Sequence, residues 1–269
     1  MTGFDDFLQA FQRLELPRGA PVIAHASLSA FGPVQGGAEA LLAALLRVFP
    51  SLVMPTFTYK TMLTPSAGPP HNAMHYGEGA DRNLLAEFFR PSLPADRLMG
   101  VLPELLRRHP AAQRSSHPIL SFSGVLASGI IGSQTLQDPL APLRLLTETG
   151  GWVLLLGVDH TVNTSLHYGE RQAGRRGFVR WALTPRRVVE CPGFPGCSDG
   201  FNQLEAEVAP LMRRAVVGQG LIQAGPLQGL VQAACRRVQA DPLALLCDRS
   251  YCERCRQVEQ LATVGYKEE

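Results

Sequence analysis

Short apolar runs alternate with amphipathic stretches along the chain. The clearest run covers residues 152–156 (WVLLL), ends at Gly157, and is typical of a strand buried on both faces. Similar runs predict strands at residues 21–25, 51–54 and 186–191. Apolar positions at helical spacing predict helices at residues 4–14, 38–49, 83–89, 100–108, 140–146, 201–217 and 227–239. Because strands and helices alternate, we expect an α/β fold with a central mixed sheet and flanking helices.

Polar residues follow the predicted strand at 152–156 directly. If Thr164 or Ser165 caps a helix, His167 and Glu170 lie three residues apart on one face of it. Open α/β sheets place their ligands beyond the carboxyl ends of strands. Histidine exchanges a proton near neutral pH, and a carboxylate within reach orients the ring and stabilises its charged form. An ordinary structural His–Glu pair at a helix start has the same spacing, so the spacing alone leaves both interpretations open.

Two further groups of residues suit an anionic or carbonyl ligand. Gly36 and Gly37 precede a predicted helix, whose free N–H groups can hold an anion, although a plain connecting turn explains the glycines more simply. Arg114, Ser115 and His117 precede an apolar segment, and Arg and Ser beside a His can bind phosphate or polarise a carbonyl. A capped turn with a stacked arginine is the alternative for this second group.

Composition narrows the class of protein. The chain has 269 residues and a formal net charge of +2, which gives no sign of a nucleic-acid partner. No apolar run approaches the length of a membrane span, so we expect no transmembrane helix and no membrane partner. The acidic, amphipathic N-terminus is unlike a secretory signal. We therefore expect a cytoplasmic protein with reduced thiols.

All six cysteines lie in the last third of the chain. A C-x-x-C pair and a second pair with five residues between its cysteines predict a tetrahedral structural zinc site. Its expected ligands are Cys191, Cys197, Cys252 and Cys255. Cys247 competes with Cys191 or Cys197 for one position, and reduced, unligated thiols are the alternative. A redox C-x-x-C is less favoured, because the motif lies far from any βαβ start.

Five motifs follow one another in register over about residues 20–185. They are HASL at 25–28, GPVQGG at 32–37, MPTFT at 54–58, RSSHP with SF at 114–122, and LLGVD with NTSLHYGE at 155–170. This set resembles the aminoglycoside 3-N-acetyltransferase family. The resemblance implies the family's own α/β architecture rather than the GCN5-type fold, acetyl-coenzyme A as cofactor, and acetyl transfer to an amine.

The resemblance also implies roles for individual residues. His167 would act as general base on the acceptor amine, with Thr164 or Glu170 fixing its tautomer. Whether Glu170 serves His167 or binds the substrate stays open. The implied cofactor-binding residues are His25, Ser27, Leu28, Val34, Gly36, Gly37, Thr56, Phe57, Arg114, Ser115 and His117. The residues expected to receive a cationic acceptor are Asp159, Glu104 and Tyr59.

Departures from the family pattern bear on the acceptor. The isoelectric point near 8.3 and the six arginines of residues 171–187 favour another amine over a polycationic drug. Gly169 stands where the family motif His-Tyr-Ala-Glu has alanine, which we expect to loosen the helix slightly. We therefore expect an N-acetyltransferase acting on a small-molecule amine, with the 3-amino group of an aminoglycoside, and so antibiotic resistance, as one candidate. A zinc-dependent hydrolase and a catalytically silent coenzyme-A-binding protein are the alternatives.

The expected organisation is a core with a C-terminal addition. Residues 1–185 would form the acetyl-coenzyme-A-binding catalytic core, and residues 186–269 a helical, cysteine-rich subdomain packed on it. A homodimer is the default oligomeric state.

Overall fold

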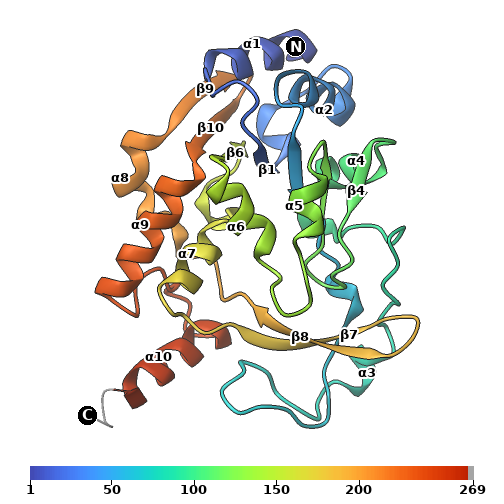
Figure 1. Ribbon diagram of the computed structural model, residues 1–269, viewed down its shortest axis with the longest axis vertical. Coiled ribbons are helices and arrows are strands. Elements are labelled where there is room, and N and C mark those ends of the chain that lie inside the picture. Colours follow the sequence, from blue (N-terminus) through green and yellow to red (C-terminus); the bar gives the residue numbers. More distant parts are fainter. Residues whose placement is uncertain (266–269) are drawn as a thin grey trace.

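The computed structural model describes residues 1–265 and has a seven-stranded sheet at its centre (Figure 1). The strand order is β4-β5-β2-β1-β6-β10-β9. The strands are β1 (Val22–Ala26), β2 (Leu52–Pro55), β4 (Ala112–Arg114), β5 (Phe122–Val125), β6 (Trp152–Leu156), β9 (Arg213–Val217) and β10 (Gly220–Pro226). β1 is parallel to both β2 and β6, whereas the other neighbouring pairs are antiparallel. The predicted mixed sheet is confirmed.

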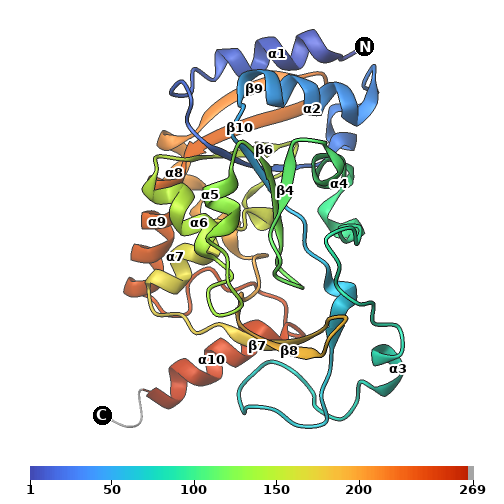
Figure 2. The same ribbon diagram turned by 45° about the vertical axis from the view of Figure 1, so that its right-hand side comes forward.

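Helices cover both faces of this sheet. They are α1 (Phe4–Arg13), α2 (Gly37–Val48), α3 (Ala80–Asn83), α4 (Val101–Arg108), α5 (Ser128–Gly132), α6 (Ala141–Glu148), α7 (Leu166–Gln172), α8 (Glu205–Val208), α9 (Leu227–Ala240) and α10 (Glu253–Gly265). Figure 2 shows α1 and α2 on one side of β6, β10 and β9, and α6, α7 and α9 on the other. None of the helices within residues 1–265 has the length and apolar character needed to cross a lipid bilayer.

Alternation along β1 builds the two halves of the core. Val22 and Ala24 pack into the cluster that holds α1 and α2, while Ile23 packs into the cluster that holds α6 and α9. All three side chains are fully buried. Successive strand residues point to opposite faces, so a strand buried on both sides must be apolar at every position. The uninterrupted run at β6 has the same cause.

A second, three-stranded sheet lies at the end of the molecule remote from the N-terminus (Figure 1). Its order is β3-β7-β8, with β3 (Met62–Leu63), β7 (Phe178–Leu183) and β8 (Val188–Phe194). β7 and β8 form an antiparallel hairpin, and α10 lies near this hairpin in both views (Figure 2). The hairpin pairs residues on the two sides of the predicted domain boundary at residue 185.

Three predicted segments differ from the structure. The helix expected at 201–217 is replaced by short helical turns and by β9, because Pro210 interrupts the helical ladder and residues 213–217 pair with β10. The helix expected at 83–89 does not form, and the short helix α3 ends at Asn83. The backbone N–H groups of Glu87 and Phe89 donate to the carbonyl oxygens of Lys60 and Leu183 instead. The description of residues 186–269 as helical is also wrong, because this part supplies β8, β9 and β10.

Candidate active site

A cavity of about 920 Å³ opens at the carboxyl ends of the three parallel strands. The loops after β1, β2 and β6 line it, together with the start of α4 and residues 194–199. The connection from β1 to β2 passes through α2 on one face of the sheet, whereas α5 and α6 lead into β6 on the other face. The chain therefore adds β2 on one side of β1 and β6 on the other, so the connections diverge between β1 and β6. Ligands of open α/β sheets bind at such a switch point.

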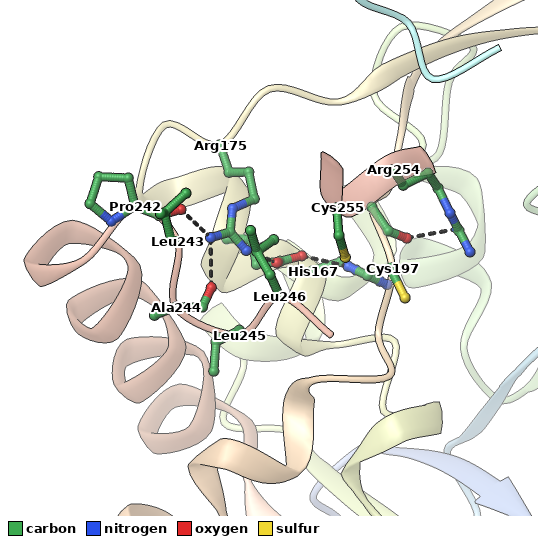
Figure 3. A network of polar contacts seen from close by, with 12 residues as sticks. His167, Arg175, Cys197, Pro242, Leu243, Ala244, Leu245, Leu246, Arg254 and Cys255 are labelled. Carbon is green, nitrogen blue, oxygen red and sulfur yellow. Dashed lines mark hydrogen bonds and ion pairs between the residues drawn. The ribbon is translucent and has the colours of Figure 1, made fainter. Parts of the chain in front are cut away.

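A buried chain of polar contacts ends at this cavity. His167 lines the cavity, and its Nδ1 lies 2.6 Å from Oε2 of Glu170. The other carboxylate oxygen of Glu170 accepts a hydrogen bond from Nη1 of Arg175. Nη2 of Arg175 also donates to the carbonyl oxygens of Pro242 and Ala244, at 2.7 Å each, as Figure 3 shows. The predicted His167–Glu170 pair is thus present and continues to a third residue.

The network fixes the proton on the imidazole. The side chains of His167, Glu170 and Arg175 are 8%, 5% and 6% exposed, so their electrostatic interactions are weakly screened. Glu170 forms an ion pair with Arg175, and a carboxylate only accepts hydrogen bonds. Nδ1 of His167 therefore carries the hydrogen, and Nε2 of the neutral ring is left as a proton acceptor. The ring is further held by an edge contact with Phe201, with centroids 4.8 Å apart.

Sequence reasoning missed Arg175. It lies five residues after Glu170, beyond the last residue of α7, so helical spacing does not pair the two. Only the turn that ends α7 brings the guanidinium back to the carboxylate. The same arginine holds residues 242–244, which are about 70 positions away in the chain and could not be paired with it from a single sequence.

Many of the predicted ligand-binding residues do line the cavity. They are His25, Ser27, Leu28, Val34, Gly37, Phe57, Tyr59, Thr164 and His167. Gly36 and Thr56 are neighbours of lining residues but are not part of the wall. The buried hydroxyl of Thr56 instead bonds to Ser121 and Ser123.

Two lining side chains have strongly shifted acidities. Burial lowers the pKa of His25 to about 3, so its imidazole is neutral, and its buried Nε2 has no hydrogen-bond partner within residues 1–265. A buried polar atom of this kind is satisfied when a ligand or water donates to it or accepts from it. Burial also raises the pKa of Tyr59 to about 12, which keeps its hydroxyl protonated as a donor.

The predicted Arg114, Ser115 and His117 lie outside the cavity wall. Arg114 donates to Thr56 and Pro91 carbonyl oxygens at 2.8 and 3.0 Å and to the Ser121 hydroxyl at 3.1 Å, so its guanidinium is engaged in joining loops. Burial lowers its pKa to about 10. The Ser115 hydroxyl accepts from the N–H of Phe122 at 2.8 Å. Nδ1 of His117 accepts two backbone N–H groups, and burial lowers the pKa of His117 to about 4.

The predicted acidic residues Glu104 and Asp159 also lie outside the wall. Glu104 accepts from Arg107 and from the N–H of Ala95, and these contacts outweigh partial burial and lower its pKa. Asp159 accepts from Thr161 and from Asn202 at 2.8 Å. Partial burial acts to raise the pKa of Asp159, but these hydrogen bonds together lower it. Both carboxylates therefore already have protein partners.

The C-terminal part of the chain supplies one wall of the cavity, which sequence reasoning also missed. This wall contains Phe194, Pro195, Gly196, Ser198, Asp199 and Arg254. Arg254 donates to the carbonyl oxygen of Gly196 at 2.8 Å. Of the lining residues, all within the described part of the chain, Asp199 is the only carboxylate, and the guanidinium groups are those of Arg97 and Arg254.

The cysteines gather close to this wall. The sulfur atoms of four of them lie within 4.8 Å of one another: Cys197, Cys247, Cys252 and Cys255. The prediction of Cys191 as a fourth ligand is wrong, because Cys191 lies on β8 and its side chain packs into the large core cluster. Cys247, the predicted competitor, lies in the cluster instead. All six cysteines are free thiols.

Known proteins similar to this chain share its fold over most of its length. Residues 23–239 match the family described as aminoglycoside 3-N-acetyltransferase. Aminoglycoside N(3)-acetyltransferase III of Salmonella sp is 31% identical over 238 residues, which cover 78% of this chain and 82% of the relative. The crystal structure of an AAC(3)-IVa mutant in complex with a gentamicin covers 96% of this chain and 97% of its own, with a TM-score of 0.76 and 24% identity. AAC-IIIb with CoASH covers 88% and 96%, with a TM-score of 0.72 and 22% identity.

Proposed function

Because the chain belongs to the aminoglycoside 3-N-acetyltransferase family, we propose that it transfers the acetyl group of acetyl-coenzyme A to an amino group, with His167 as the general base. One observation carries the proposal: the buried His167–Glu170–Arg175 network ends at the large cavity. Two fold neighbours support the ligand classes, since AAC-IIIb binds CoASH and the AAC(3)-IVa mutant binds a gentamicin.

The network suits the chemistry of this transfer. Only a neutral amine attacks a thioester carbonyl, so a base must remove a proton from the acceptor nitrogen. Nε2 of His167 takes that proton while the new N–C bond forms and the C–S bond breaks. The coenzyme leaves as a thiolate, and the imidazolium then returns the proton to its sulfur to give the free thiol. The Glu170 carboxylate stabilises the imidazolium that results, and Arg175 holds this carboxylate in place through its other oxygen. The low exposure of all three groups strengthens these interactions.

The walls offer groups for both ligands. Ser27 and Leu28, which follow β1, and Gly37, the first residue of α2, would hold the coenzyme at the N-terminus of this helix. Bound acetyl-coenzyme A supplies the reactive thioester carbonyl. Thr164 and Asp199 would face the acceptor amine, since both line the cavity with His167.

Aminoglycosides are the first acceptors to test, with the 3-amino group as the expected position. A less cationic amine is the second candidate, and the charges of the wall favour it. Asp199 is already paired with Arg249 at 2.7 Å, and the wall carries Arg97 and Arg254 as well. A polycation is attracted by several carboxylates rather than by one.

Release of free thiol from acetyl-coenzyme A over a panel of amines tests this function. The panel contains kanamycin-type and gentamicin-type aminoglycosides, along with amines that carry a single charge. We expect thiol release that depends on an acceptor, and NMR of the product then identifies the acetylated nitrogen. Turnover of singly charged amines alone would keep the reaction and replace the acceptor. Coenzyme binding without thiol release for every acceptor would favour the silent binding protein.

The zinc-hydrolase alternative has little support. The group of possible metal ligands found in the described residues consists of four cysteines and contains no histidine. A metal bound by four thiolates has no open position for water, so such a site is structural rather than hydrolytic.

A further inference from the structure

We propose that the four clustered cysteines bind one zinc ion, which fixes the C-terminal wall of the cavity to the start of α10. The ligands of this zinc site are Cys197, Cys247, Cys252 and Cys255. Metal binding as such does not depend on the proposed acetyl transfer. The consequence for ligand binding does, since it assumes that the cavity holds the substrates.

The spacing of the sulfur atoms suits tetrahedral zinc. A Zn–S bond of about 2.3 Å places the sulfur atoms of a tetrahedral site about 3.8 Å apart. Here the four sulfur atoms all lie within 4.8 Å of one another, and those of Cys247 and Cys255 are 3.5 Å apart. A disulfide requires about 2.05 Å between its sulfur atoms, so the pair is not a disulfide. Four converging thiols select zinc over calcium or magnesium, which prefer oxygen ligands.

Backbone donors already point at two of the sulfur atoms. The N–H of Asp199 donates to Sγ of Cys197 at 3.5 Å, and the N–H of Cys247 donates to Sγ of Cys255 at 3.4 Å. Such outer contacts orient metal ligands and offset thiolate charge. A zinc ion with four thiolates has a net charge of −2. The guanidinium of Arg249, which is paired with Asp199, also interacts electrostatically with Cys247 and Cys197.

The four cysteines lie outside the two large cores. Cys197, Cys247 and Cys255 are only 5%, 8% and 2% exposed. Among the residues that the structure describes, they form a small cluster of their own, with Leu246 and Cys252 packed against it, apart from the two large cores. The stretch between α9 and α10 contains neither helix nor strand. A core of this size supplies little hydrophobic stabilisation, and binding of structural zinc adds directly to folding stability.

The zinc site is continuous with the cavity wall. Cys197 stands between Gly196 and Ser198, which both line the cavity. Arg254, between the two cysteines of the C-x-x-C motif, also lines it and donates to the carbonyl oxygen of Gly196. In Figure 3, Cys197, Cys255 and Arg254 lie together on the side of His167 away from Arg175. Zinc binding therefore positions one wall of the cavity without touching the reacting atoms.

Metal analysis of the purified full-length protein tests the site. We expect about one zinc per chain, and loss of that zinc in Cys197→Ala. Cys191→Ala is the matched control, because Cys191 is equally buried but lies outside the cluster. Zinc retained by Cys197→Ala, or lost from Cys191→Ala alone, would overturn the assignment.

A second measurement uses the wild-type protein, so it does not depend on folding of a variant. Cobalt(II) replacing the native metal is expected to give thiolate-to-metal charge-transfer bands and the visible absorption of a tetrahedral site. Titration with a thiol-modifying mercurial should release zinc in step with four reacting thiols. A protein that binds neither ion after refolding with excess metal would contradict the proposal. Metal content and spectrum report on zinc alone, whatever the acetyl-transfer assay gives.

Discussion

Glu170 is the residue that joins the base to the rest of the protein. One carboxylate oxygen contacts His167 and the other contacts Arg175, and the side chain is 5% exposed. A carboxylate engaged at both oxygens cannot turn toward a substrate amine. The sequence left open whether Glu170 serves His167 or binds the substrate, and in the structure it pairs with His167. Its part in catalysis remains a proposal about positioning.

Glu170→Gln separates positioning from binding. The amide keeps the shape but has no negative charge to stabilise the imidazolium, so we expect kcat to fall about 10²-fold with little change in the KM for either substrate. Steady-state kinetics measure both. Glu104→Gln is the control, because Glu104 also pairs with an arginine but lies outside the cavity wall. An equal loss of kcat in both variants, or a change confined to KM, would contradict the assignment.

His117 links stability to pH. Its folded-state pKa of about 4 lies below the ordinary value of 6.5, so the unfolded chain binds more protons as the pH falls between these values. The stability present above pH 6.5 is therefore progressively lost, by about 3 kcal/mol at pH 4. His117→Asn keeps an acceptor for the two backbone N–H groups and should remove this part of the acid dependence. Urea unfolding from pH 7 to 4 measures it.

His109→Asn is the control for that experiment. The ring of His109 also accepts a backbone N–H, that of Ala111, but near the surface. We expect this variant to keep the acid dependence of the wild type. Identical pH profiles for His117→Asn and the wild type would show that another group causes the acid loss.

Among the elements, α7 depends on its close approach to α9. A Cβ atom added at Gly169 would lie 2.6 Å from the carbonyl oxygen of Val231 and 2.8 Å from Cβ of Ala234. The glycine was expected only to loosen the helix. Its larger effect is to let α9 pack against α7, which carries His167 and Glu170. The packing of α7 against α9 therefore requires a residue without a Cβ atom at position 169.

Gly169→Ala tests this packing. Although alanine favours a helix, overpacking against α9 should lower the free energy of unfolding by about 1–3 kcal/mol. Chemical denaturation measures the change. Gly129→Ala in α5 is the matched control, since nothing lies within 4 Å of its added Cβ, and we expect no loss there. A Gly169→Ala variant as stable as the wild type would show that α9 can move away without cost.

Elements with strong local signals could be predicted from the sequence. β6 was predicted at its observed bounds because a fully buried strand is a continuous apolar run. The segment 201–217 was misread because its apolar residues also fit helical spacing, while its strand pairing with β10 is a tertiary contact. The same difference applies to the network of His167. Glu170 lies at helical spacing from His167 and could be predicted, whereas Arg175 reaches Glu170 only through a turn and could not.

At the scale of the whole molecule, the cavity combines the two ends of the chain. The wall from the loop after β1 was anticipated, whereas residues 194–199 and Arg254 were not, because no local pattern places them beside His167. The sheet is composite as well. β10, from the C-terminal part, pairs with β6 over five residue pairs. Strands from both sides of residue 185 thus form one sheet.

The fragment 1–185 should therefore fail to fold alone. Without β9 and β10, β6 becomes an edge strand with a fully apolar sequence, and α9 no longer covers its face. We expect aggregation or the absence of a cooperative thermal transition, measured by circular dichroism beside the full chain. A soluble fragment with a cooperative transition would establish residues 1–185 as an independent core.

The most direct test of the central claim is a single-turnover measurement of acetylated acceptor by mass spectrometry, comparing the wild type with His167→Ala. Enzyme is held in excess over an acceptor amine that the panel shows to be turned over, with saturating acetyl-coenzyme A, so product release does not limit the rate. The wild type should convert the acceptor fully, and the variant should do so about 10²- to 10⁴-fold more slowly while still binding the coenzyme. Equal rates for the two proteins would contradict the assignment of His167 as the base.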